Sequence, residues 1–350
     1  MQYNLFVFAG QSNMMGACVL PPKHLLSVKR CLEYRYNPVH RGNANGSFVP
    51  VSYDTGEFLY HDPKAAYQNT DETGKSRLCD YEKNTYFVSA LSNLDSREEK
   101  TVKPFSAYSE SERNPAASLV PYFCEEWERL GETALVAHIA KGGVSADHFF
   151  SKEMIAEYNQ FAASNGFSPL SGTGDAEEIY CRKCQAFFRD AEKAYPNACG
   201  KRVLVWNQGE SDSQNSCKEY QKKLSLIWEK AQKIGFDLFL IIRTGYWFTH
   251  DTCHVMQAQE EFCKETPNAY IITRGISFMP DPHFMENPED FYIREPAPEY
   301  SFCRDSFYGY QNSHINEKGF ILATKAAARN TYQILKEQKQ PLLEEDIVRY

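Results

Sequence analysis

The first strongly apolar segment of the chain runs into a polar turn and reads Leu5-Phe6-Val7-Phe8-Ala9-Gly10-Gln11-Ser12-Asn13. An apolar, aromatic-rich run that stops at Gly-Gln-Ser-Asn predicts a buried strand followed by a tight turn. In open α/β sheets, ligands bind at the carboxyl ends of the strands. Ser12 is therefore a candidate nucleophile, although a serine in this position is also typical of a helix N-cap.

Similar apolar runs recur along the chain and alternate with helical patterns. Buried strands are predicted at Asn4–Ala9, Ala134–Ala140, Arg202–Trp206, Asp237–Arg243 and Ala269–Thr273. Helices are predicted at Ser118–Leu130, Glu177–Ala194, Cys217–Ile234, Val255–Lys264 and Glu317–Gln338. Strands that alternate with helices, and that are apolar along their whole length, predict an α/β fold with a parallel sheet covered on both faces.

Two long intervals, 17–115 and 275–311, do not fit this alternation. The first is polar without a sustained period, and the second holds five prolines and many aromatic residues. Loops of this length inside a compact domain are usually functional or carry small elements of their own. We expect one catalytic domain over residues 1–350, with both intervals as insertions that form the walls of a substrate cleft.

Composition narrows the classes of protein that the chain can belong to. The net charge of −8 and the isoelectric point near 5.7 argue against a nucleic-acid-binding protein, which normally has a basic face. No stretch approaches the ~20 apolar residues of a membrane span. No signal peptide is recognisable, so we expect the eleven cysteines to be free thiols and the protein to be cytoplasmic. A protein whose leader had been removed would have the same sequence. Cys181 and Cys184 fall on a helical pattern and predict no metal site.

A serine nucleophile needs a base within hydrogen-bond reach and a group that orients the base. His314 is the best candidate base, because it lies in a polar stretch just before the last predicted helix. His138 lies within a predicted strand, so we expect it in the core. His250 and His254 are spaced i,i+4, and we expect them at the surface rather than in a zinc site.

Two further segments follow predicted strands and can supply the rest of a catalytic site. In Trp206-Asn207-Gln208-Gly209-Glu210-Ser211-Asp212, a glutamine amide can donate to a developing oxyanion and a carboxylate two residues later can face the same cleft. Gly142 and Gly143 follow another strand and give backbone N–H groups room to approach a substrate, although they are equally typical of a plain strand-to-helix turn.

Together these motifs resemble the SGNH hydrolase superfamily. In the family's order they are Gly10-Gln11-Ser12-Asn13-Met14-x-Gly16, Gly142-Gly143-x-Ser145, Trp206-x-Gln208-Gly209-Glu210-x-Asp212 and His314-x-Asn316-x-x-Gly319. The chain is most similar to the sialate O-acetylesterase-like branch, which includes the acetylxylan esterases of the sixth carbohydrate esterase family. The resemblance implies a three-layer α/β/α sandwich whose central parallel sheet of about five strands has a flavodoxin-like order.

Carried over residue by residue, the resemblance makes Ser12 the nucleophile and His314 the base. The oxyanion hole would comprise the N–H of Ser12, a backbone N–H at Gly142 or Gly143, and the Gln208 side chain. We also expect substrate contacts from three residues of these motifs, which are Gln11, Asn13 and Trp206.

The acid of the triad requires a choice. Many SGNH enzymes have an aspartate three residues before the catalytic histidine, and this chain has Gln311 there. In the acetylxylan esterase-like branch the acid comes from the Trp-x-Gln-Gly-Glu motif, which points to Glu210. Asp305, Asp212 and a Ser–His dyad are the alternatives.

The sequence therefore predicts a carbohydrate O-acetylesterase that uses a serine nucleophile, needs no metal or cofactor, and favours an acetylxylan-type substrate. Its partner would be an O-acetylated carbohydrate, with neither nucleic acid nor membrane. One alternative is a sialic-acid 9-O-acetylesterase or a general esterase on the same scaffold. A carbohydrate-binding protein descended from an esterase is the alternative outside enzymes.

Overall fold

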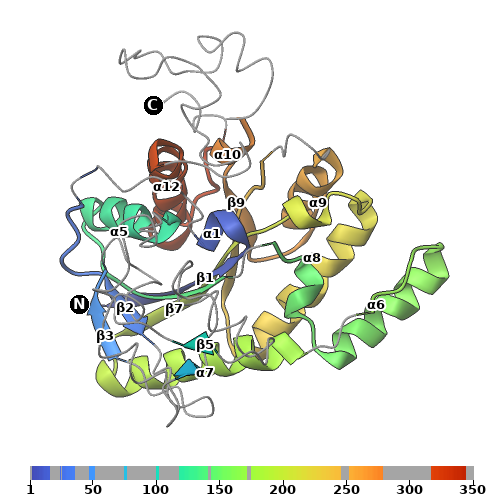
Figure 1. Ribbon diagram of the computed structural model, residues 1–350. Helices are drawn as coiled ribbons and strands as arrows, with labels where there is room; N and C mark the ends of the chain where they lie inside the picture. Colours follow the sequence, from blue (N-terminus) through green and yellow to red (C-terminus); the bar gives the residue numbers. More distant parts are fainter. Residues whose placement is uncertain are drawn as a thin grey trace.

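The computed structural model describes residues 2–15, 24, 26–35, 47–51, 75–76, 100–101, 118–140, 143–171, 175–245, 252–278 and 317–343. Its centre is a seven-stranded sheet in the order β3-β2-β6-β1-β7-β8-β9. Figure 1 shows helices on both faces of this sheet, which makes a three-layer α/β/α sandwich. The predicted fold class is confirmed.

The five predicted strands all form and pair in parallel. They are β1 (Tyr3–Gly10), β6 (Ala134–Ala140), β7 (Cys199–Asn207), β8 (Leu238–Ile242) and β9 (Ala269–Thr273). Their spatial order, β6-β1-β7-β8-β9, is the flavodoxin-like order. Every residue of β6 and β8 is buried, as expected for strands covered on both faces.

The interval 17–115 contributes two strands that the sequence analysis did not predict. They are β2 (Leu32–Arg35), parallel to β6, and β3 (Ser47–Pro50), an antiparallel edge strand. The sheet therefore has six parallel strands and one antiparallel strand, where about five parallel strands were expected. Each new strand has only four residues, too few for a clear alternating pattern. A separate two-stranded sheet pairs β4 (Lys75–Ser76) with β5 (Lys100–Thr101). Most of the rest of this interval, and nearly all of 275–311, lies outside the described residues.

Alternate residues of each strand face two separate cores. Leu5, Val7 and Ala9 of β1 face one core, whereas Phe6 and Phe8 face the other. The first core is covered by α7 (Asp175–Ala194), α8 (Cys217–Ile234) and α9 (Cys253–Glu265). The second is covered by α5 (Leu119–Arg129) and α12 (Glu317–Tyr332). Helix α12 continues into the π-helical turn η7 (Gln333–Glu337).

The helix α6 (Lys152–Asn165) was not predicted and extends away from the body of the molecule in Figure 1. It buries only Met154, Tyr158 and Ala162, so its apolar stripe is one residue wide and gives a weak signal in the sequence. Four shorter helices complete the described part: α1 (Ser12–Met15), η2 (Ala146–Phe149), η3 (Glu210–Asp212) and α10 (Gly275–Phe278). None of the helices in the described ranges combines the length and apolar character that crossing a membrane requires.

Candidate active site

Three central strands end level with one another at one edge of the sheet. Gly10, the last residue of β1, pairs with Ala140 of β6 on one side and with Asn207 of β7 on the other. The chain passes from β1 to β6 in one direction and then returns to β7 in the other, so strand order reverses here. In parallel α/β sheets this reversal opens the crevice in which ligands bind.

The turn after β1 is fixed by close backbone contact with β7. Gly10 has a φ of +151°, and a Cβ atom there would lie only 2.0 Å from the carbonyl oxygen of Asn207. The N–H of the next residue, Gln11, donates to this same oxygen over 3.0 Å. Only glycine permits this approach, and the chain then starts α1 at Ser12.

Ser12 therefore lies at the first position of a short helix at the carboxyl edge of the sheet. Its own N–H and that of Asn13 belong to the first turn, where a helix supplies no acceptors. The residue is 9% exposed. The turn is also held from β6, because Nε2 of the buried His138 donates to the carbonyl oxygen of Met14 over 2.7 Å. This contact agrees with the core position predicted for His138.

A direct hydrogen bond joins the serine turn to the acidic motif after β7. Asn13 Nδ2 donates to Glu210 Oε1 over 3.0 Å, across 197 residues of sequence. Both side chains are buried. The second carboxylate oxygen, Oε2, is buried and has no donor in hydrogen-bonding geometry within the described part of the chain.

Burial raises the pKa of Glu210 above its ordinary value. Its own backbone N–H, the Asn13 amide and the nearby Thr244 hydroxyl oppose this effect, and the charge of Asp212 adds to it. A buried carboxylate with a raised pKa is suited to hold a cationic partner, because that partner would stabilise its charged form.

Gln208 occupies the centre of the site, but its amide is already engaged by the protein. Nε2 faces three acceptors: Asp212 Oδ2 at 2.6 Å, Gln11 Oε1 at 3.1 Å and the carbonyl oxygen of Val144 at 3.1 Å. Oε1 lies 2.8 Å from the Tyr220 hydroxyl. An amide nitrogen has only two hydrogens, so this arrangement leaves none for a substrate oxyanion.

The other predicted substrate contacts differ in where their side chains lie. Gln11 Oε1 accepts from Gln208 Nε2 and from the N–H of Ser211, so this side chain lies within the same network. Trp206 is fully buried on one face of β7, where its ring packs against Phe149 and Phe239 at centroid distances of 5.1 and 6.3 Å. Trp206 therefore packs as a core residue, and its assignment as a substrate contact stays a prediction.

Gly209 separates the buried amide from the buried acid. Its φ is +159°, and a Cβ atom there would lie 2.6 Å from Val255 Cγ1 and 2.9 Å from Thr244 Cγ2. The carbonyl oxygen of Gln208 accepts hydrogen bonds from Gln259 Nε2 and Tyr220 Oη over 2.9 and 2.7 Å. The backbone of the motif is thus held from α8 and α9.

Asp212 forms a buried ion pair that the sequence analysis did not anticipate. Its Oδ1 accepts from Lys223 Nζ over 2.6 Å, and its Oδ2 accepts from Gln208 Nε2 and from the N–H of Ala146. Lys223 also donates to Asp147 Oδ1 over 2.8 Å. The available signal was a lysine between Tyr220 and Leu224, on the apolar stripe of the predicted helix Cys217–Ile234.

Several predicted residues lie outside the described residues. These are His314, Gly142, Gln311, Asp305 and His250. Gly143 is described and starts the segment that leads from β6 into η2. The N-terminal half of α12 lies near the carboxyl edge, because α10 follows the end of β9 directly and a Cβ atom on Gly275 would lie 3.4 Å from Ala323 Cα.

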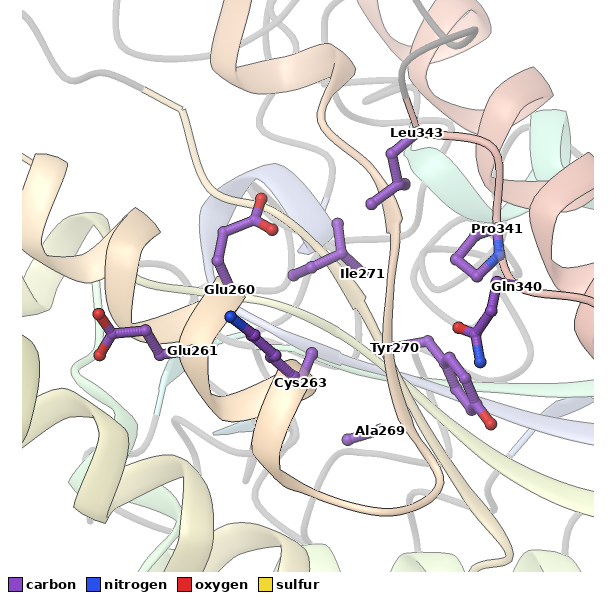
Figure 2. Close-up of a pocket in the computed structure, with 10 residues that line it drawn as sticks. Glu260, Glu261, Cys263, Ala269, Tyr270, Ile271, Gln340, Pro341 and Leu343 are labelled. Atoms are coloured by element: carbon purple, nitrogen blue, oxygen red, sulfur yellow. The ribbon is translucent and has the colours of Figure 1, made fainter.

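A surface cavity of about 470 Å³ lies elsewhere, between α9, β9 and the segment after η7. Figure 2 shows Glu260, Cys263, Tyr270, Ile271 and Leu343 around it. Ala269 also lines it and is the first residue of β9, so the cavity is at the amino end of that strand. The predicted site is at the opposite, carboxyl edge of the sheet.

Two cysteines and one histidine among the described residues lie where the sequence predicted them. Cys181 and Cys184 are buried on α7, and His254 is exposed on α9. No group of metal-ligating side chains occurs within the described ranges.

The chain matches no protein-family model and no curated protein. Its fold resembles that of NanS, with a TM-score of 0.51 and 12% sequence identity over 96% of this chain and 98% of NanS. Two other solved structures align with lower scores. A protein from Arabidopsis thaliana gives 0.48 at 11% identity, over 94% of this chain and 97% of its own. A carbohydrate acetylesterase from Xanthomonas citri gives 0.38 at 11% identity, over 93% and 56%. The similarity to NanS extends over nearly the whole of both chains and supports the same α/β fold.

Proposed function

We propose that the chain is a serine esterase that releases acetate from O-acetylated carbohydrates, with acetylated xylan as the favoured substrate class. The observation that carries the proposal is the hydrogen bond from Asn13 to Glu210. It brings the residue next to the candidate nucleophile and the candidate acid together where strand order reverses. The resemblance of the sequence motifs to the SGNH acetylesterases supplies the reaction class.

The proposed reaction starts with attack of Ser12 Oγ on the carbonyl carbon of the acetyl ester, while His314 takes the hydroxyl proton. Glu210 would orient the His314 ring and stabilise its charged form through the unsatisfied Oε2. When the tetrahedral intermediate collapses, the sugar oxygen leaves with the proton from His314. Water then attacks the acetyl-serine by the same route and releases acetate.

The oxyanion would be held by backbone N–H groups of Ser12 and of the Gly142–Gly143 turn. The Gln208 amide has no hydrogen left for this task, so we assign it a positioning role. It joins the serine turn, through Gln11, to the segment after β6, through Val144. Asp212 is excluded from the acid's role in this proposal, because its oxygens already accept from Lys223, Gln208 and Ala146.

The test compares the parent with Ser12→Ala and Glu210→Gln on p-nitrophenyl acetate and on acetylated xylan. A fall in kcat of about 10⁴-fold is expected for both variants. Ser164→Ala and Glu229→Gln, at exposed helix positions, are the matched controls and should retain parental rates.

Each other outcome changes the proposal in a defined way. Loss of activity in Ser12→Ala alone would keep the esterase but move the acid away from Glu210. A parent that releases acetate from O-acetylated sialic acid and not from xylan would replace the substrate. A parent that hydrolyses none of these esters, yet binds the glycan equally well after Ser12→Ala, would favour a binding protein.

A further inference from the structure

The most deeply buried ion pair in the described part of the chain lies next to the proposed site. The side chains of Lys223 and Asp212 are 3% and 0% exposed, and their charged atoms are 2.6 Å apart. Asp147, at 19% exposed, is the second partner of the lysine at 2.8 Å. The Lys223 ammonium also lies 5.7 Å from the ring centre of Tyr158, which belongs to α6.

This pair joins three segments that are distant in sequence. Lys223 lies on α8, Asp212 follows β7, and Asp147 lies on η2 after β6. Asp212 Oδ2 accepts from the N–H of Ala146 over 2.7 Å and from Gln208 Nε2 over 2.6 Å. The segment that starts at Gly143 is thus anchored at Val144, Ala146 and Asp147, all by groups within one network.

Two charges removed from water must be paired well, and loss of one leaves the other uncompensated. Burial alone would lower the pKa of Lys223, but the attraction of Asp212 and Asp147 outweighs it and holds the pKa above its ordinary value. The lysine therefore stays charged at neutral pH. Without it, Asp212 would be a buried charge without its cation, and the link that Lys223 makes between Asp212 and Asp147 would be lost.

We propose that Lys223 is a positioning residue that acts through Asp212 and Asp147 to hold the Gly143 segment at the distance from Ser12 that oxyanion binding requires. The inference rests on the proposed function, since it assigns the backbone of that segment to the oxyanion hole. It assigns a role to Lys223, which takes no part in the proposed reaction steps. A displacement of about 1 Å at such a donor can reduce kcat about 10²-fold without loss of substrate binding.

The experiment replaces Lys223 by methionine, which has a similar length and no charge. Lys222→Met is the matched control, because Lys222 is the preceding residue on α8 and pairs with Glu157 of α6 in a more exposed contact. Asp147→Asn is the milder second variant, which removes one partner of the lysine and leaves the pair with Asp212. Reactive serines are counted by stoichiometric labelling with an organophosphonate, so that kcat refers to folded sites. Amide hydrogen exchange is followed in the peptide that covers 143–150.

We expect kcat per labelled serine to fall about 10²-fold in Lys223→Met, with KM for p-nitrophenyl acetate unchanged within about threefold and faster exchange in 143–150. Lys222→Met should match the parent in all three readouts. Equal kcat in the two lysine variants would overturn the positioning role and leave the esterase proposal intact. If Lys223→Met does not fold, a parental kcat in Asp147→Asn overturns the role and a fall of about tenfold supports it. A parent that neither hydrolyses acetyl esters nor labels at Ser12 would instead remove the proposed function, and this role with it.

Discussion

Glu210 is the proposed acid of the site, and the burial of its carboxylate has a cost in folding stability. Its carboxylate is buried 3.0 Å from the amide donor of Asn13, and burial raises its pKa. When the pKa of a carboxyl group is higher in the folded than in the unfolded state, its ionisation lowers the free energy of unfolding. For Glu210 this loss begins as pH rises above the ordinary pKa of 4.5. At neutral pH the charge therefore reduces stability.

Glu210→Gln should consequently raise the melting temperature at pH 7 while it abolishes esterase activity. The glutamine oxygen can still accept from Asn13, and the buried charge is gone. Thermal unfolding at pH 7 and at pH 4 gives the check, because the advantage of the variant should shrink at the lower pH, where the parental carboxyl is protonated. A variant less stable than the parent at both pH values would show that the charge has a structural partner.

Gly10 is required by contact with a neighbouring strand and not only by its φ of +151°. Gly10→Ala would place a methyl group 2.0 Å from the Asn207 carbonyl oxygen and should destabilise the protein by more than about 2 kcal/mol. Gly166→Ala is the control, because Gly166 also has a positive φ, of +73°, but a methyl group there would meet no atom within 4 Å. Urea unfolding of both variants separates the cost of the steric contact with Asn207 from the cost of placing an alanine at a positive φ. Equal losses would mean that β1 and β7 can move apart.

At the scale of elements, α8 both covers the sheet and supports the site. It carries Tyr220 and Lys223 on its buried face, and its first turn is closed by a capping box. Ser216 Oγ accepts from the N–H of Glu219, and Glu219 Oε2 accepts from the N–H of Ser216 over 2.9 Å. The position of the helix start therefore depends on one serine.

Ser216→Ala should lower the free energy of unfolding by about 1 kcal/mol, because the first turn loses an acceptor for its backbone N–H groups. Ser225→Ala is the matched control on the same helix, where the hydroxyl donates only to the carbonyl oxygen of Gln221. Chemical denaturation measures both. If Ser216→Ala unfolds like the parent, solvent must satisfy the N-terminus of α8 equally well.

At the scale of the whole molecule, several carboxylates that join distant elements have pKa values held below the ordinary range. In each, burial alone would raise the pKa, but arginine or lysine partners outweigh it: Arg129 and Arg329 for Glu126, Lys223 for Asp147, and Arg274 and Arg243 for Glu260. A group with a depressed folded pKa stabilises the protein above its ordinary value, and this contribution is lost as pH falls through the folded pKa.

The melting temperature should therefore fall as pH drops below the ordinary carboxyl values of 4.5 and 3.8. Glu126→Gln is the informative variant, because Glu126 is 3% exposed and links α5 to α12 through Arg329. It should melt lower than the parent at pH 7 and lose less on acidification. Calorimetry from pH 7 to pH 3 tests this, and a parental acid profile in the variant would contradict it.

How far the sequence specifies the fold differs between its elements. The five long strands and the helices that accompany them were predictable because apolar periodicity extends over many residues, as in the helix Cys217–Ile234, which has the predicted bounds. The edge strands β2 and β3 were missed because four residues carry little periodic signal, and α6 because it buries a single narrow stripe.

The same division applies to the candidate site. The sequence by itself determined which residues lie at strand ends, because the apolar runs stop at Gly10 and just before Asn207. Only the tertiary structure decided what those residues contact. The pairing of Asn13 with Glu210, the saturation of the Gln208 amide and the buried Lys223–Asp212 pair all join segments brought together by strand order. A one-dimensional pattern records burial and local turns, whereas hydrogen-bond partners depend on which strands become neighbours and on how their ends align.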